Sequence, residues 1–217
     1  MEEKRNVLSI EHLSISFSRY ERGFRRTNLN AIRDLSLTVG EGEMVAVVGA
    51  SGSGKSLLAH AVLGILPYNA SWSGTMNYRG EMLTEKRMKA LRGKEIVLVP
   101  QSVSYLDPLM KIGDQIQNGK KDVSVKEKCL AVLKRYGLAP DIRGKYPFQL
   151  SGGMTRRVLI STAVMEKPKL VIADEPTPGL HFADVHNLVD ILRRLTENGH
   201  TVIVIEHNLD VIKTADY

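Results

Sequence analysis

A glycine-rich segment at residues 49–56 leaves this chain few folds to adopt. It reads Gly-Ala-Ser-Gly-Ser-Gly-Lys-Ser and fits the pattern G-x-x-x-x-G-K-[ST]. An apolar run over 44–48 precedes it and predicts a buried parallel strand, and the stretch from Ser56 to about Ile65 predicts a helix. Glycines let the backbone turn so that its N–H groups point inward, at the positive end of that helix. The segment therefore predicts a phosphate-binding loop between a strand and a helix.

The side chains of this loop indicate a nucleoside triphosphate and Mg²⁺ as ligands. Lys55 can reach the β- and γ-phosphates, and the Ser56 hydroxyl can ligate Mg²⁺. We expect the nucleotide to contact the loop and the first helical residues, namely Gly49, Ser51, Gly52, Ser53, Gly54, Lys55, Ser56 and Leu57.

Composition narrows the class of protein further. The 217 residues suffice for one large domain, or for a core with a small inserted lobe. The formal charge of +6 suits a phosphate ligand but is too small to indicate nucleic acid, which we do not expect as a partner. Cys129 is the only cysteine, which excludes an intramolecular disulfide and favours a reducing, cytosolic setting. No apolar run approaches the roughly 20 residues that span a bilayer, so any membrane role goes through a partner.

Strand and helix patterns alternate along the chain. Strands are expected at 7–16, 31–39, 44–48, 95–99, 170–173 and 201–205, with a short strand within 67–78 and a loop over 18–30. Helices are expected at 56–65, 84–92, 112–118, 124–137, 151–166 and 182–198. This order predicts an α/β fold with a mostly parallel sheet and right-handed crossovers. The lysine-rich stretch after residue 102 has few β-branched runs and predicts an inserted helical lobe over about 102–166.

An acidic pair, Asp174-Glu175, directly follows an apolar strand. Ligands of open α/β sheets bind at the carboxyl ends of strands. Asp174 can hold Mg²⁺, often through water, and Glu175 can orient an attacking water or accept its proton. Taken alone, an acidic pair after a strand is more often the start of a helix. Its place downstream of the phosphate-binding loop favours the metal and catalytic interpretation.

Three further elements are candidates for the same site. Ser151, Gly152 and Gly153 open a predicted helix and offer a hydroxyl and free N–H groups as a second phosphate-binding element, although such a triplet also occurs in ordinary helix starts. The Gln101 amide, just past a strand, can touch Mg²⁺ or the attacking water. His207, also just past a strand, can donate a hydrogen bond to the γ-phosphate or serve a structural role.

These elements, in this order and spacing, resemble the Walker A, Q-loop, signature, Walker B and H-loop motifs of the ATP-binding cassette (ABC) family. The resemblance implies a P-loop NTPase fold: an ABC ATPase core with a mostly parallel sheet, an antiparallel β subdomain and an inserted helical lobe, all in one nucleotide-binding domain over 1–217. It also implies a head-to-tail dimer with ATP at the interface, where Ser151 and Gly153 of one subunit bind the γ-phosphate held by the other. An aromatic residue would stack on adenine, either Tyr20 or Phe24.

The middle of the chain is similar to one branch of this family. The stretch 146–154, Tyr-Pro-Phe-Gln-Leu-Ser-Gly-Gly-Met, resembles peptide and nickel importers, as do 106–110 and 112–116. This branch implies an ATP-binding and hydrolysing subunit that energises import of peptides, nickel or metal chelates. It implies a homodimer, or a heterodimer with a sister ATPase, bound through transmembrane permease subunits to the inner face of the cell membrane.

The last quarter departs from that branch. Residues 179–184 and 204–216 resemble the UvrA-type DNA excision-repair ATPase, and His181 stands where most cassettes have the D-loop aspartate. This mixture fits an unusual natural cassette or a composite sequence. Two alternatives follow: a DNA-repair ATPase, whose zinc modules Cys129 alone cannot build, and a cassette that binds ATP but hydrolyses it poorly. Because cassettes usually continue with another strand, we expect the chain to be truncated at Tyr217.

Overall fold

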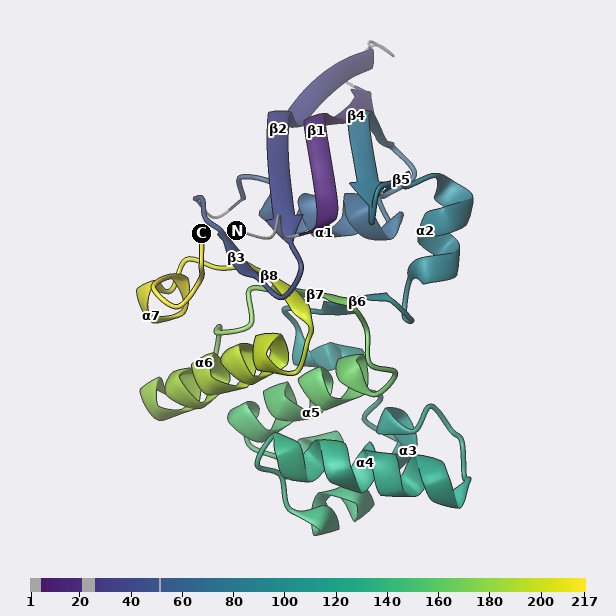
Figure 1. Ribbon diagram of the computed structural model, residues 1–217, viewed down its shortest axis with the longest axis vertical. Coiled ribbons are helices and arrows are strands. Elements are labelled where there is room, and N and C mark those ends of the chain that lie inside the picture. Colours follow the sequence, from purple (N-terminus) through teal and green to yellow (C-terminus); the bar gives the residue numbers. More distant parts are fainter. Residues whose placement is uncertain (1–4, 21–25, 51) are drawn as a thin grey trace.

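The computed structural model describes residues 5–20, 26–50 and 52–217, with only the backbone of Tyr20 and Arg26. An antiparallel sheet and a parallel sheet lie one above the other, and helix α1 (Lys55–Leu63) fills the space between them (Figure 1). The remaining large helices cover the opposite face of the parallel sheet. This is the α/β architecture that the sequence predicts.

The antiparallel sheet is built on a long hairpin. Strands β1 (Asn6–Tyr20) and β2 (Arg26–Gly40) pair with β4 (Ala70–Tyr78) and the short β5 (Glu81–Met82) in the order β2-β1-β4-β5. The loop expected over 18–30 is wrong, because pairing continues to Tyr20 opposite Arg26. This end of the hairpin is mostly polar, so it lacks the apolar alternation that marks a half-buried strand.

The second sheet is entirely parallel. It contains β3 (Met44–Val47), β6 (Ile96–Val99), β7 (Leu170–Asp174) and β8 (Thr201–Ile205), in the order β3-β8-β7-β6. Every residue of β7 and β8 is buried, which explains their continuous apolar sequences. At one edge, Ala46 N–H donates to Tyr217 O at 2.8 Å, so the last residues lie along β3.

Alternate residues of the central strands enter two different cores. Ile203 and Ile205 pack upward with α1 and the antiparallel sheet, whereas Val202 and Val204 pack downward with the helices. The lower core also contains Leu133 of α4 (Val123–Arg135). Because both faces are covered, the edge formed by the strand carboxyl ends is where the sheet can meet a ligand.

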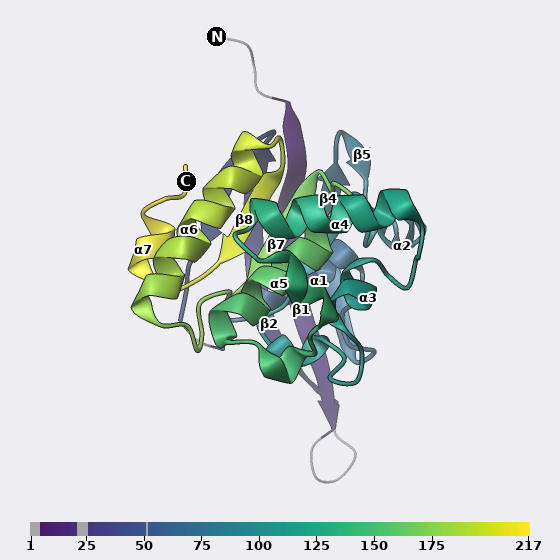
Figure 2. The ribbon, with the colours of Figure 1, turned by 90° about the horizontal axis from the view of Figure 1, so that it is seen from below.

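The helices below the parallel sheet come mostly from the segment between β6 and β7. That segment contains α3 (Ile112–Ile116), α4 and α5 (Gly152–Val164), and α6 (Phe182–Glu197) connects β7 to β8. Two short helices, α2 (Glu85–Leu91) and α7 (Leu209–Ile212), lie at the sides. Figure 2, seen from below, shows α4 and α5 in front of the strands. None of the helices in the described ranges has the length and apolar character needed to cross a membrane.

Candidate functional site

The predicted site residues converge on one edge of the parallel sheet. The loop 49–56 follows β3, His207 follows β8, Asp174 ends β7 and Gln101 follows β6. Since all four strands run in the same direction, their carboxyl ends meet at this edge. Four stretches that are far apart in sequence are thereby brought together.

The glycine-rich loop has the backbone that its sequence predicts. Gly52 and Gly54 have φ values of 77° and 90°, in the left-handed region that favours glycine. A Cβ on Gly54 would also lie 3.0 Å from the carbonyl oxygen of Ala31, so β2 closely flanks the loop. The Lys55 side chain is only 6% exposed, and its ammonium donates to the carbonyl oxygens of Gly49 and Ala50 at 2.8 Å each. Ser51 lies outside the described residues.

Ser56 and Asp174 form the oxygen-rich part of the site. Ser56 Oγ donates a hydrogen bond to Asp174 Oδ1 at 2.8 Å, and Asp174 is 6% exposed. Asp174 is the last residue of β7, while α6 begins only at Phe182, so the acidic pair does not cap a helix. Hydroxyl and carboxylate oxygens suit Mg²⁺, which proteins commonly hold through one or two such groups together with substrate phosphates.

Glu175 is held by three neighbouring elements. Its φ of 39° is unusual for a residue other than glycine, and its N–H donates to Ile205 O of β8 at 2.9 Å. One carboxylate oxygen, Oε2, accepts a hydrogen bond from Gln101 Nε2 at 2.7 Å, and the other lies 3.9 Å from Lys55 Nζ. Strained backbone of this kind is frequent at functional sites.

Sequence reasoning missed the buried residue Glu206, which organises the loops after β7 and β8. Its side chain is fully buried, with Oε1 accepting from Thr177 N–H at 2.8 Å. Oε2 accepts from the N–H groups of His207 and Asn208 at 2.9 and 3.1 Å. The imidazole of His207 remains 63% exposed at the site edge. An acidic residue directly after an all-apolar strand was the available signal.

The second predicted phosphate-binding element, Ser151 to Gly153, has its contacts within α5 and with the residues before and in α6. Ser151 Oγ accepts from Met154 N–H at 3.3 Å and caps α5. A Cβ on Gly152 would face Gly179 O at 3.5 Å, and one on Gly153 would collide with the Asp184 carboxylate. Within the described residues, no hydrogen bond joins 151–153 to 49–56.

The comparison with protein families decides the classification. Residues 32–178 match the family model described as "ABC transporter". The chain belongs to the ABC transporter family. The resemblance inferred from the ordered motifs is thereby confirmed.

Individual relatives agree with this assignment. The chain is 35% identical to the oligopeptide transport ATP-binding protein AmiE of Streptococcus pneumoniae serotype 4, covering 97% of this chain and 62% of that protein. It is 33% identical to the oligopeptide transport ATP-binding protein OppD of Bacillus subtilis, covering 95% and 60%. The chain thus spans about 60% of the length of these relatives. The cbiO1 structure from Clostridium perfringens, described as part of the ABC transporter complex cbiONQ, is 26% identical, with a TM-score of 0.80 over 99% of this chain and 83% of that one.

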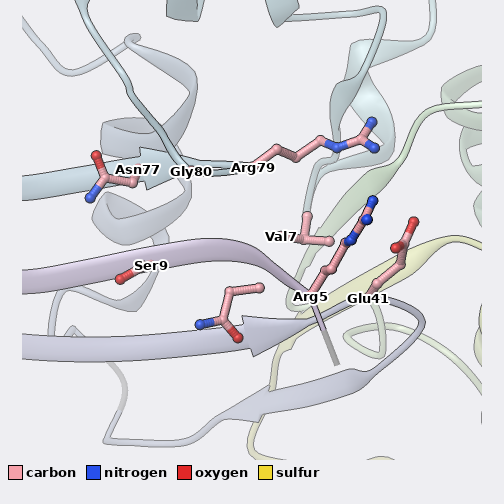
Figure 3. A pocket seen from close by; sticks show the side chains of 8 residues that line it. Arg5, Val7, Ser9, Glu41, Asn77, Arg79 and Gly80 are labelled. Atoms are coloured by element: carbon pink, nitrogen blue, oxygen red, sulfur yellow. The ribbon is translucent and has the colours of Figure 1, made fainter. Parts of the chain in front are cut away.

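This ABC cassette has one cavity beside the phosphate-binding loop and another at the end of the antiparallel sheet. One of about 240 Å³ adjoins the phosphate-binding loop, with Ile32, Val47 and Lys55 among its lining residues. A larger one, about 540 Å³, lies at the end of the antiparallel sheet, where Arg5 and Arg79 extend in the same direction and Glu41 lies beside Arg5 (Figure 3). The predicted adenine contacts are not placed, because Phe24 and the Tyr20 side chain lie outside the described part of the chain.

Proposed function

We propose that this chain is the ATP-binding and hydrolysing subunit that energises an ABC importer for peptides. The observation that carries this proposal is the convergence of Lys55, Ser56, Asp174 and Glu175 at one sheet edge, linked by the 2.8 Å and 3.9 Å contacts described above. The names of the relatives AmiE and OppD favour oligopeptides over the nickel or metal chelates that the sequence also allowed. Those names favour a transport role over the DNA-repair alternative as well.

We assign phosphate binding to the loop and to Lys55. The backbone turn at Gly52 and Gly54 suits N–H groups that bind phosphate oxygens, at the start of α1 where the helix dipole is positive. Lys55 adds a full positive charge from a largely buried position. Ser56 and Asp174 would hold Mg²⁺, which neutralises charge on the phosphates when bound.

We assign hydrolysis to Glu175 and its neighbours. Transfer of a phosphoryl group to water depends mainly on positioning and on charge neutralisation. Glu175 would orient the water and accept its proton, while Gln101 holds one of its carboxylate oxygens. His207 would donate a hydrogen bond to the γ-phosphate from the edge of the site.

A second subunit would complete the site. Because Ser151 and Gly153 make no hydrogen bond to the described part of the loop, we assign them to the nucleotide held by a partner, in a homodimer or a heterodimer with a sister ATPase. Transmembrane permease subunits would hold the dimer at the inner face of the membrane. We assign residues 1–217 to one nucleotide-binding domain, with about 102–166 as its helical subdomain, and expect Tyr20 or Phe24 to contact adenine.

Uptake of labelled substrate tests the transport assignment. Cells lacking this gene are expected to lose uptake of a radiolabelled oligopeptide and to regain it with the wild-type gene but not with Lys55→Ala. Uptake of radioactive nickel is measured in the same strains. Unchanged oligopeptide uptake in the deletion strain, or loss of nickel uptake alone, would contradict the peptide assignment.

A further inference from the structure

Arg156 is a buried cation in helix α5 to which the sequence motifs give no role. Its side chain is only 2% exposed. Nη1 donates to Pro100 O and Nη2 donates to Gln101 O, each at 2.7 Å. The guanidinium therefore binds two successive main-chain oxygens of the segment that follows β6.

These two hydrogen bonds bear on the position of Glu175. Bonds from the planar guanidinium to two successive carbonyls hold the two peptide planes on either side of the Gln101 Cα, and hence the direction in which the Gln101 side chain leaves the backbone. That side chain ends in the 2.7 Å hydrogen bond to Glu175 Oε2. A continuous chain of short contacts thus runs from α5 through Arg156 and Gln101 to Glu175.

The surroundings of Arg156 argue against a role in stability alone. Burial lowers the pKa of the guanidinium, while the buried Glu206 carboxylate raises it. Its Nε has no hydrogen-bond partner among the described residues. A buried charge with incomplete hydrogen bonding is a weak source of stability, since a neutral side chain of similar size often packs as well. The two well-formed bonds to Pro100 and Gln101 point to a geometric role.

We propose that Arg156 is a positioning residue for ATP hydrolysis, which holds Gln101 against Glu175 and ties helix α5 to that carboxylate. The inference rests on the hydrolysis proposed above. Arg156 itself contacts neither the nucleotide nor the attacking water. Its effect passes through the Gln101 backbone.

The test combines amide hydrogen exchange over residues 101–106 with steady-state Mg-ATPase kinetics. The variants are Arg156→Gln, Gln101→Ala and their combination. Arg92→Gln is the matched control, because Arg92 Nη1 also donates to two successive carbonyl oxygens, those of Leu63 and Gly64 at the far end of α1. Arg156→Lys is a second variant in case Arg156→Gln fails to fold, since it keeps the charge but lacks the planar fork.

For Arg156→Gln we expect exchange over 101–106 to accelerate about tenfold and kcat to fall about tenfold, with KM within about twofold. The double variant should be no slower than Gln101→Ala alone, because both changes break one chain of contacts. Arg156→Lys should likewise accelerate exchange over 101–106. Arg92→Gln should change neither readout.

Unchanged exchange over 101–106 in Arg156→Gln would overturn the proposal. If only Arg156→Lys folds, unchanged exchange in that variant would overturn it. Losses in kcat that multiply in the double variant would overturn it too. A wild-type protein without Mg-ATPase activity would instead contradict the proposed function, and the exchange measurement would then decide the role of Arg156 by itself.

Discussion

Ser56 Oγ donates a hydrogen bond to Asp174 Oδ1 at 2.8 Å, which joins the first turn of α1 to the end of β7. These two residues are 118 positions apart in sequence, and their contact creates the paired oxygen atoms to which we assign Mg²⁺. The pairing makes the metal requirement testable at a single side chain.

Removal of the Ser56 hydroxyl should weaken the binding of Mg²⁺ that supports ATPase activity. For Ser56→Ala we expect the Mg²⁺ concentration that gives half-maximal ATPase activity to rise about tenfold or more, because one oxygen ligand is lost. Ser56→Thr keeps the hydroxyl and should stay close to wild type. Chelation of Mg²⁺ with EDTA should abolish turnover in all three proteins. An unaltered Mg²⁺ dependence in Ser56→Ala would remove Ser56 from the metal site.

Replacement of Gly74 by alanine should destabilise the fold more than the same replacement of Gly93. Its φ is 106°, and a Cβ there would lie 2.6 Å from His12 O and 2.7 Å from Glu11 O, both backbone atoms. We expect Gly74→Ala to lower the free energy of unfolding by about 2–4 kcal/mol, from left-handed strain plus steric overlap. Gly93→Ala, with φ 77° and no atom within 4 Å of the Cβ, should cost about 1–2 kcal/mol. Urea unfolding compares the two, and equal losses would contradict the overlap.

The pH dependence of stability should carry opposite contributions from two histidines. Burial lowers the pKa of His200 below its ordinary 6.5, although Nδ1 lies 2.5 Å from Pro168 O. The unfolded chain then binds more protons, so this contribution is present above pH 6.5 and is lost as pH falls through the folded pKa. Thermal unfolding should therefore show a smaller loss of Tm between about pH 7 and 5 in His200→Gln than in wild type.

His12 provides the contrast within the same molecule. Its hydrogen bond with the Asp34 carboxylate raises the pKa of the imidazole above 6.5. This contribution is present below pH 6.5 and is lost as pH rises through the folded pKa. His12→Gln should keep the loss of Tm that wild type shows between about pH 7 and 5. It should lower Tm only slightly at acidic pH, because the side chains of His12 and Asp34 are both exposed. The same change in the slope of Tm against pH in His200→Gln and His12→Gln would contradict these assignments.

His181 occupies the N-cap position before α6 without a side-chain hydrogen bond, so an aspartate there should stabilise the helix. The N-cap position of α6 has no side-chain hydrogen bond, and Asp accepts well from the N–H groups of the first turn. We expect His181→Asp to raise the free energy of unfolding by about 0.5–1.5 kcal/mol and His181→Ala to give no gain. We also expect higher ATPase activity or stronger cooperativity in His181→Asp, because it restores the usual D-loop residue. Thermal unfolding and ATPase assays check both, and a Tm below wild type would contradict the capping argument.

Local patterns predicted the parallel sheet and the residues at its edge. Strands such as β7 and β8 are buried on both faces and therefore appear as unbroken apolar runs, and the residues after them reach the site because parallel strands end together. The polar end of the β1–β2 hairpin carried no such pattern. Arg156 was missed for another reason: its partners Pro100 and Gln101 are distant in sequence, and only the folded chain brings them together.

The most direct test of ATP hydrolysis at Glu175 compares Mg-ATP turnover and ATP binding in wild type and in Glu175→Gln, with Lys55→Ala as the variant that lacks the phosphate-binding ammonium. We predict that Glu175→Gln binds ATP as tightly as wild type but turns it over at least about a hundredfold more slowly, since the group that orients and deprotonates water is lost. Lys55→Ala should lose ATP binding. Turnover in Glu175→Gln equal to that of wild type would contradict the catalytic assignment.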